Sequence, residues 1–151
     1  MSDFLAVFLG ACLVNNLVLH HLLAAAPAAA VSRRMDVAAE LGLAVGAVIV
    51  LSTPLAWLLD TVVLQRLGLT HLRTLAFLIL IVVVTAIDLP LLARVRPLWH
   101  NRLAIYFPLA LLNSGVLGAA LIGTANVHGF GAALAFALGT GAGYTLVCVL
   151  F

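Results

Sequence analysis

Two pairs of adjacent polar residues interrupt otherwise apolar stretches of this sequence. Asn15 and Asn16 lie in the first stretch, and Asn113 and Ser114 lie in a similar stretch late in the chain. A carboxamide in an apolar environment is costly unless its donors and acceptors find partners. We expect each pair to break a helix, so that freed polar groups line an ion path or cradle a cofactor. The alternative is that the pairs only form hydrogen bonds between helices.

Two acids lie close to the ends of apolar stretches. Asp88 comes late in one stretch, just before Pro90. An ionisable residue inside a membrane span is by default a candidate ion ligand or proton relay; the alternative is an exposed or arginine-paired acid. Asp60 ends an earlier stretch beside Trp57, a residue type that anchors helices at membrane surfaces. We therefore expect Asp60 to be exposed and Arg73, which opens the next stretch, to extend to the same surface.

Histidine and cysteine give no clear metal site. Adjacent residues on a helix point about 100° apart, so His20 and His21 cannot both face one metal without distortion. We expect them near the membrane surface instead. Cys12 and Cys148 both lie in apolar stretches and match neither a disulfide framework nor zinc spacing. They are interpreted as structural residues.

Glycines are concentrated near the end of the chain, at positions 129, 131, 139, 141 and 143. The pattern Gly-x-Gly-x-Gly inside an apolar stretch is not a nucleotide loop, because no strand precedes it. Small residues allow helices to approach closely. We expect this face to pack against a neighbouring helix.

The composition is that of a membrane protein. Of the 151 residues, 66% are hydrophobic and 8% are charged, and the mean hydropathy is +1.29. A soluble domain carries about 25% charged residues. The net charge of +2 is too small to indicate nucleic-acid binding. The sequence shows no catalytic triad, acid–base carboxylate pair, Walker loop or flavin-attachment pattern, so we expect no catalysis by this polypeptide alone.

Five apolar segments are long enough to cross a bilayer, which takes about 20 residues. They are continuous and do not alternate, which excludes transmembrane strands. We predict an all-α polytopic membrane protein that forms one transmembrane domain over residues 1–151. The predicted spans are 4–25, 37–59, 72–93, 103–122 and 130–151.

The arginines predict an orientation in the membrane. The first and third linkers hold Arg33, Arg34, Arg94, Arg96 and Arg102, and the fourth linker holds none. Cytoplasmic loops carry the excess of basic residues. We therefore expect a periplasmic N-terminus and a cytoplasmic residue 151.

The first and fourth segments resemble each other, since each has a polar pair followed by leucine and valine. Three spans separate their starts, so the two units would insert with opposite orientation. That layout is an inverted repeat of discontinuous helices. We predict an incomplete 3+3 inverted repeat, with broken first and fourth helices and five of the six spans.

Four stretches carry a resemblance to a known family, and the resemblance covers essentially the whole chain in order. Their positions are 13–16 (Leu-Val-Asn-Asn) with Pro27 and 31–34 after it, 56–61 (Ala-Trp-Leu-Leu-Asp-Thr), 72–77 (Leu-Arg-Thr-Leu-Ala-Phe), and 107–109 leading into 113–118. On these motifs the sequence resembles the RnfA-like (RsxA) subunits of Rnf-type electron transport complexes. It is also similar to the related NqrE-like subunits of sodium-pumping NADH:quinone oxidoreductases.

The resemblance implies a place in a larger assembly. Subunits of this family have six spans as two inverted repeats in the bacterial inner membrane, with the N-terminus outside. They pair with a homologous RnfE-like subunit of opposite orientation. A [2Fe-2S] cluster held by cysteines is implied at that interface, and the other Rnf-type subunits supply flavins and further clusters.

The sequence departs from the family at the implied cluster ligands. The first cysteine position holds Ala26, and the second holds Ser114. Iron–sulfur clusters are held by thiolates or, less often, imidazoles; alanine cannot ligate, and serine is a poorer ligand. Cys12 and Cys148 lie too far along the chain to replace them, and the sixth span is absent from the 151 residues. Either the chain is a diverged paralogue, or it is an incomplete copy.

The sequence therefore predicts a membrane subunit of an Rnf/Nqr-type complex that couples electron transfer to ion translocation. Its own role would be scaffold and ion path, without a cluster of its own. The alternative is a small ion transporter or channel that acts without electron transfer. A non-functional remnant is a third reading.

Overall fold

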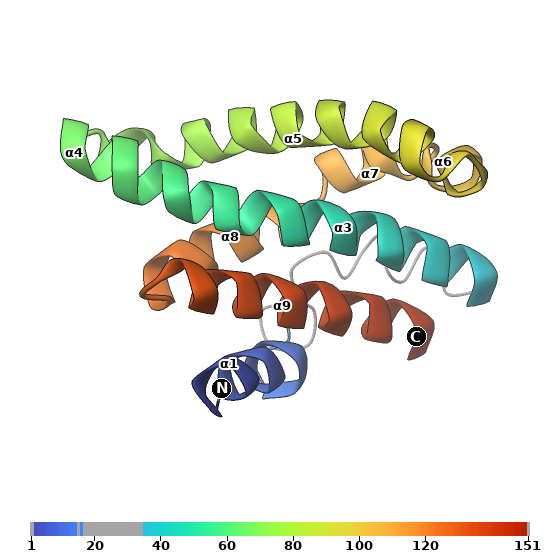
Figure 1. The fold of residues 1–151 in the computed structure, drawn as a ribbon, viewed down its shortest axis with the longest axis horizontal. Helices are drawn as coiled ribbons and strands as arrows, with labels where there is room; N and C mark the ends of the chain where they lie inside the picture. Colours follow the sequence, from blue (N-terminus) through green and yellow to red (C-terminus); the bar gives the residue numbers. More distant parts are fainter. Residues whose placement is uncertain (1, 15, 17–34, 151) are drawn as a thin grey trace.

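The computed structural model describes residues 2–14, 16 and 35–150, and the regular structure in these residues is entirely helical. The predicted all-α class is confirmed. Helix α3 (Met35–Leu59) lies at the centre of the bundle, between α5 (Arg73–Val95) and α9 (Phe130–Leu150) (Figure 1). Helix α1 (Ser2–Leu9) packs on the far side of α9. The long helices lie side by side, as expected for a membrane bundle.

Three helical stretches are long and apolar enough to cross a membrane: Met35–Leu67, Thr70–Val95 and Phe130–Leu150. They correspond to the second, third and fifth predicted spans. The first predicted span lies only partly within the described residues. A count of five spans therefore remains a prediction.

The second span is longer than the sequence indicated. The loop expected from Asp60 onward is wrong, because α3 continues through the π-helical turn η2 (Asp60–Leu64) into α4 (Gln65–Leu67). Gly68 then ends the helix with a left-handed φ of 66°, a conformation that glycine adopts at little cost. A short 3-10 turn, η3 (Thr70–Leu72), leads into α5.

The fourth predicted span is divided into two helices. These are α7 (Phe107–Leu111) and α8 (Ser114–Asn126). Asn113 between them has an extended backbone, with φ −81° and ψ 116°. The break thus falls at the predicted polar pair. The preceding linker contains a further helix, α6 (Pro97–Leu103), which the sequence analysis missed.

The first helix is also interrupted. After α1 the chain forms a π-helical turn, η1 (Gly10–Val14), and Asn16 lies outside any helix. Asn15 lies outside the described residues. The helical hydrogen-bond pattern therefore changes just before the first predicted polar pair.

Close packing on α9 sets the core. The Cβ of an alanine at Gly141 would lie 3.1 Å from the carbonyl oxygen of Gly46, and one at Gly42 would lie 2.9 Å from the Cα atom of Thr145. Helices α3 and α9 can approach this closely because small residues face each other. The predicted packing role is confirmed for Gly139, Gly141 and Gly143, whereas Gly129 and Gly131 have no neighbour within 4 Å of such a Cβ.

Candidate functional site

The two polar breaks meet on α9. The Nδ2 atom of Asn16 donates to the carbonyl oxygens of Cys12 (2.9 Å) and Gly143 (3.1 Å). The Nδ2 atom of Asn113 donates to the hydroxyl of Tyr144, at 3.0 Å. Gly143 and Tyr144 are consecutive, so two sites far apart in sequence contact neighbouring positions of one helix. The pairing of the two breaks was expected from the sequence, but their meeting at α9 was not.

The side chain of Asn113 makes two hydrogen bonds. Its Oδ1 atom accepts a hydrogen bond from the backbone N–H of Gly115 at 2.9 Å, which caps the start of α8. Its Nδ2 atom holds Tyr144. Both side chains are buried, at 4% and 0% exposed. Ser114 begins α8 and is exposed.

The position of Asn16 against α9 requires a glycine at position 143. A Cβ at Gly143 would lie 2.7 Å from the carbonyl oxygen of Cys12 and 2.9 Å from the Nδ2 atom of Asn16. Only glycine leaves room for η1 to approach α9 this closely. One turn earlier, Gly139 meets the backbone of Phe8 in the same way. The first break is therefore held by backbone-to-backbone proximity.

Asp88 is buried inside the bundle. Its side chain is on α5, its residue is 8% exposed, and its Oδ2 atom has no hydrogen-bond partner among the described residues. It borders an apolar pocket of about 240 Å³ between α3, α5 and α7. The other lining residues are Ala47, Leu51, Leu91, Leu92, Val95, Leu103 and Phe107. No hydrogen bond described for residues 2–14, 16 and 35–150 joins Asp88 to Asn16 or Asn113.

Asp60 is not exposed, and the prediction was wrong. The residue is 1% exposed. Arg73 donates to both carboxylate oxygens, from Nε to Oδ1 at 2.7 Å and from Nη2 to Oδ2 at 3.0 Å. Gln65 donates to Oδ2 at 2.9 Å. Arg73 does not extend freely to the surface; 30% of its side chain is exposed. A bidentate guanidinium can compensate a buried carboxylate because it replaces the lost water contacts.

A polar pocket of about 590 Å³ lies next to this ion pair, and its lining includes residues from the connection between α8 and α9. Its lining combines Arg73 and Gln65 with Thr61, Thr124 and His128. At its edge, Trp57 donates from Nε1 to the carbonyl oxygen of Val127 at 3.1 Å. The loop before α9 is thus tied to α3.

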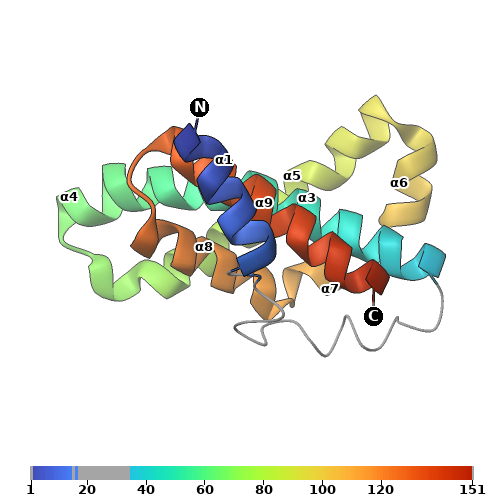
Figure 2. The same ribbon diagram turned by 90° about the horizontal axis from the view of Figure 1, so that it is seen from below.

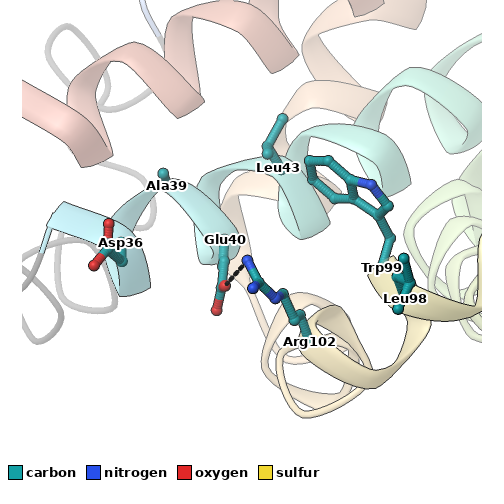
Figure 3. Close-up of a pocket in the computed structure, with 7 residues that line it drawn as sticks. All are labelled: Asp36, Ala39, Glu40, Leu43, Leu98, Trp99 and Arg102. Atoms are coloured by element: carbon teal, nitrogen blue, oxygen red, sulfur yellow. Dashed lines mark ion pairs between the residues drawn. The ribbon is translucent and has the colours of Figure 1, made fainter.

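The opposite end of the bundle carries another pocket, of about 450 Å³, between α3 and α6, where charged and apolar side chains meet (Figure 3). Glu40 and Arg102 face each other across it, with Nη1 and Oε1 3.9 Å apart. The indole of Trp99 lies beside Leu43 in the same pocket. This pocket does not follow from hydropathy, because the residues of α6 lie between two apolar segments and resemble a linker.

The residues that could replace cluster cysteines do not form a ligand set. Ser114 offers a hydroxyl at the start of α8, and Ala26, like His20 and His21, lies outside the described residues. Cys12 and Cys148 are buried free thiols in η1 and α9. Within the part of the chain that the structure describes, no three His, Cys, Asp or Glu side chains group closely enough to hold a metal ion. Among the described residues, Ser114 offers an oxygen and not a thiolate at one of the positions where the resemblance implies a cluster ligand.

Comparison with known proteins gives the family. Residues 4–151 match the family model described as "Rnf-Nqr subunit, membrane protein". The chain is 36% identical over 151 residues to a Cereibacter sphaeroides protein named as the A-type subunit of the ion-translocating oxidoreductase complex, and equally to its Yersinia enterocolitica namesake. In each case the match covers 100% of this chain and 78% of the relative. The protein is thus a membrane protein, and the chain belongs to the Rnf-Nqr family of subunits.

Proposed function

We propose that the protein is an integral inner-membrane subunit of an Rnf/Nqr-type complex that couples electron transfer to ion translocation. The observation that carries the proposal is the match along the whole chain to the family and to relatives named as subunits of an ion-translocating oxidoreductase complex. The apolar helices suit that place in a membrane complex.

Within that complex, the chain contributes polar groups to an ion path. The candidates are Asn15, Asn16, Asn113, Ser114 and Asp88. Broken helices supply free backbone ends near the midplane, which bind ions in other transport proteins. In support, Asn16 and Asn113 both contact α9, and Asp88 has an unpartnered oxygen beside a pocket.

The chain acts without an iron–sulfur cluster of its own. Alanine at position 26 and serine at position 114 provide no thiolate where the family resemblance implies one. Its role in electron transfer is then to scaffold the membrane core beside subunits that carry the cofactors. Cys12 and Cys148 remain packing residues in this proposal.

The partner is a homologous RnfE-like subunit, together with the other Rnf-type subunits. The orientation has a periplasmic N-terminus. Its support is that Arg94, Arg96 and Arg102 are all exposed and belong to the end of α5, its junction with α6, and α6. Helix α6 lies at the end of the bundle where α9 finishes, close to the start of α3 (Figure 1). At the other end, Arg73 is engaged by Asp60.

Affinity purification from native membranes tests the function. The tagged chain is extracted in a mild detergent, and its companions are identified by mass spectrometry. An unrelated tagged membrane protein of similar abundance is the control. We expect flavin-bearing subunits and an RnfE-like subunit to co-purify. Recovery of the chain alone as an oligomer that carries ion flux in liposomes would instead support an independent transporter.

A further inference from the structure

Three hydroxyl groups in the core are left without hydrogen-bond partners among the described residues. They belong to Ser52, Thr53 and Thr140, which are 0%, 0% and 1% exposed. Other buried and half-buried threonines donate to the carbonyl oxygen four residues earlier in their helix, as Thr85 does to Ile81 and Thr145 does to Gly141. An unsatisfied buried hydroxyl costs about 1–3 kcal/mol. A ligand or water is therefore expected at these positions.

Thr53 lies where three helices meet. A Cβ at Gly123 on α8 would be 2.8 Å from the Cγ2 atom of Thr53 on α3 and 3.2 Å from Cδ1 of Phe136 on α9. We call this junction of α3, α8 and α9 the seam. Its helices contact each other in pairs, and α8 lies beside α9 in the view from the α1 side (Figure 2).

Thr140 lies on the face of α9 that carries Phe136 and Tyr144. It lies one turn after Phe136 and one turn before Tyr144, and residues four apart share one face of a helix. Phe136 and Tyr144 both face α8, through Gly123 and Asn113 respectively. The polar groups of the seam therefore run from Thr53 through Thr140 to the pair formed by Asn113 and Tyr144.

Two pockets lie near the Thr53 end of the seam. Trp57, one turn from Thr53 on α3, lines the pocket of about 590 Å³ beside Arg73. Phe136, which meets Thr53 at Gly123, lines a second pocket of about 620 Å³ between α1, α8 and α9. Each of the two pockets is therefore lined by an aromatic side chain from the neighbourhood of Thr53.

Pro54 adds a further acceptor near the seam. Proline has no N–H, so the carbonyl oxygen of Val50 lacks its usual helical donor. Buried water satisfies such groups when two to four polar partners converge on it. Free carbonyl and hydroxyl oxygens are also the atoms that solvate a small cation.

We propose that the seam is a hydrated path, in which water bound to Thr53 and Thr140 connects the two pockets with Asn113 and Tyr144. The path rests on the proposed ion-translocating function and names the route by which water reaches the second polar break. Phe136 and Trp57 form its entrance. Tyr144 and Asn113 form its inner end.

Cysteine labelling in membrane vesicles tests the path. In a Cys12→Ala/Cys148→Ala background, Thr53→Cys and Thr140→Cys are treated with 2-aminoethyl methanethiosulfonate, which reacts with hydrated thiols. Ala137→Cys is the matched control, because Ala137 is equally buried on α9 but lies one turn before Gly141, on the face that packs against α3. We expect both seam cysteines to react at least ten-fold faster than the control. Equal rates would overturn the path.

A stability measurement covers the case in which a cysteine variant does not fold. Thr140→Val replaces the hydroxyl by a methyl group of similar size. In a hydrated seam the midpoint of thermal unfolding falls, because bound water loses a partner; in a dry seam it rises, because an unsatisfied group is removed. A rise would contradict the proposal. Both readouts need neither partner subunits nor ion transport, so they fail independently of the proposed function.

Discussion

Asp60 and Asp88 are both buried acids on long helices, but their surroundings are opposite. Asp60 receives three hydrogen bonds, two from Arg73 and one from Gln65. Asp88 has an Oδ2 atom with no partner in the described residues and borders an apolar pocket. A buried carboxylate is tolerated when it is paired and hydrogen-bonded; without partners it is expensive and is kept for a function. The comparison assigns Asp60 a structural role and supports the proposal that Asp88 belongs to the ion path.

The largest expected effect is the loss of the partner of Asp60. Arg73→Leu leaves a 1% exposed carboxylate without its guanidinium. Breaking a buried pair from one side costs about 3–5 kcal/mol. We expect the free energy of unfolding in detergent micelles, measured by denaturant titration, to fall by that amount.

The double variant Asp60→Asn/Arg73→Leu is the control for this prediction. Since it removes both charges, most of the lost stability should return. If Arg73→Leu alone unfolds no more easily than the unaltered protein, the ion pair does not hold this end of the bundle, and Asp60 loses its structural role.

Asn113 is a buried polar residue without charge, which can be compared with the two acids. Asn113→Ala removes the cap of α8, worth about 0.5–2 kcal/mol, and leaves the hydroxyl of Tyr144 without its donor. We expect a loss of about 2 kcal/mol in total. Tyr144→Phe removes only the second contact and should cost about half as much. Equal losses in the two variants would show that the cap contributes nothing.

Asn113 is also the part of the site that the sequence predicted best. A carboxamide followed by serine and glycine in an apolar run is a local signal for a helix start, so the break needed no knowledge of distant contacts. The glycines of α9 likewise predicted close packing between helices. Their partners in α1 and α3 were not visible, because packing between remote segments leaves no short-range pattern.

The errors have a common physical cause. Asp60 looked exposed because it ended an apolar run, whereas its burial depends on Arg73 across a turn. The signal was present, since an acid closing one segment and an arginine opening the next lie at the same end of two antiparallel helices. The continuation of α3 to Leu67 was missed because a π-helical turn changes the hydrogen-bond spacing. Neither feature follows from hydropathy.

Asp88→Asn should change function more than stability. The substitution keeps the size of the side chain and removes a charge that has an unpartnered oxygen, so we expect the free energy of unfolding to change by less than about 1 kcal/mol. Ion-coupled transport by the intact complex in proteoliposomes should fall at least ten-fold. A stability loss as large as that of Arg73→Leu would show that Asp88 is structural, and the contrast with Asp60 would disappear.

The smallest effect belongs to Glu40, a half-buried acid whose arginine partner is exposed. Arg102 lies 3.9 Å from Glu40, with 76% of its side chain exposed against 30% for Arg73. Exposed ion pairs contribute about 0–1 kcal/mol and are weakened by salt. A double-mutant cycle with Glu40→Ala and Arg102→Ala should give a coupling energy in the lower half of that range, smaller still at 1 M salt. A coupling as large as that between Asp60 and Arg73 would mean that burial does not decide how strongly these arginines hold their acids.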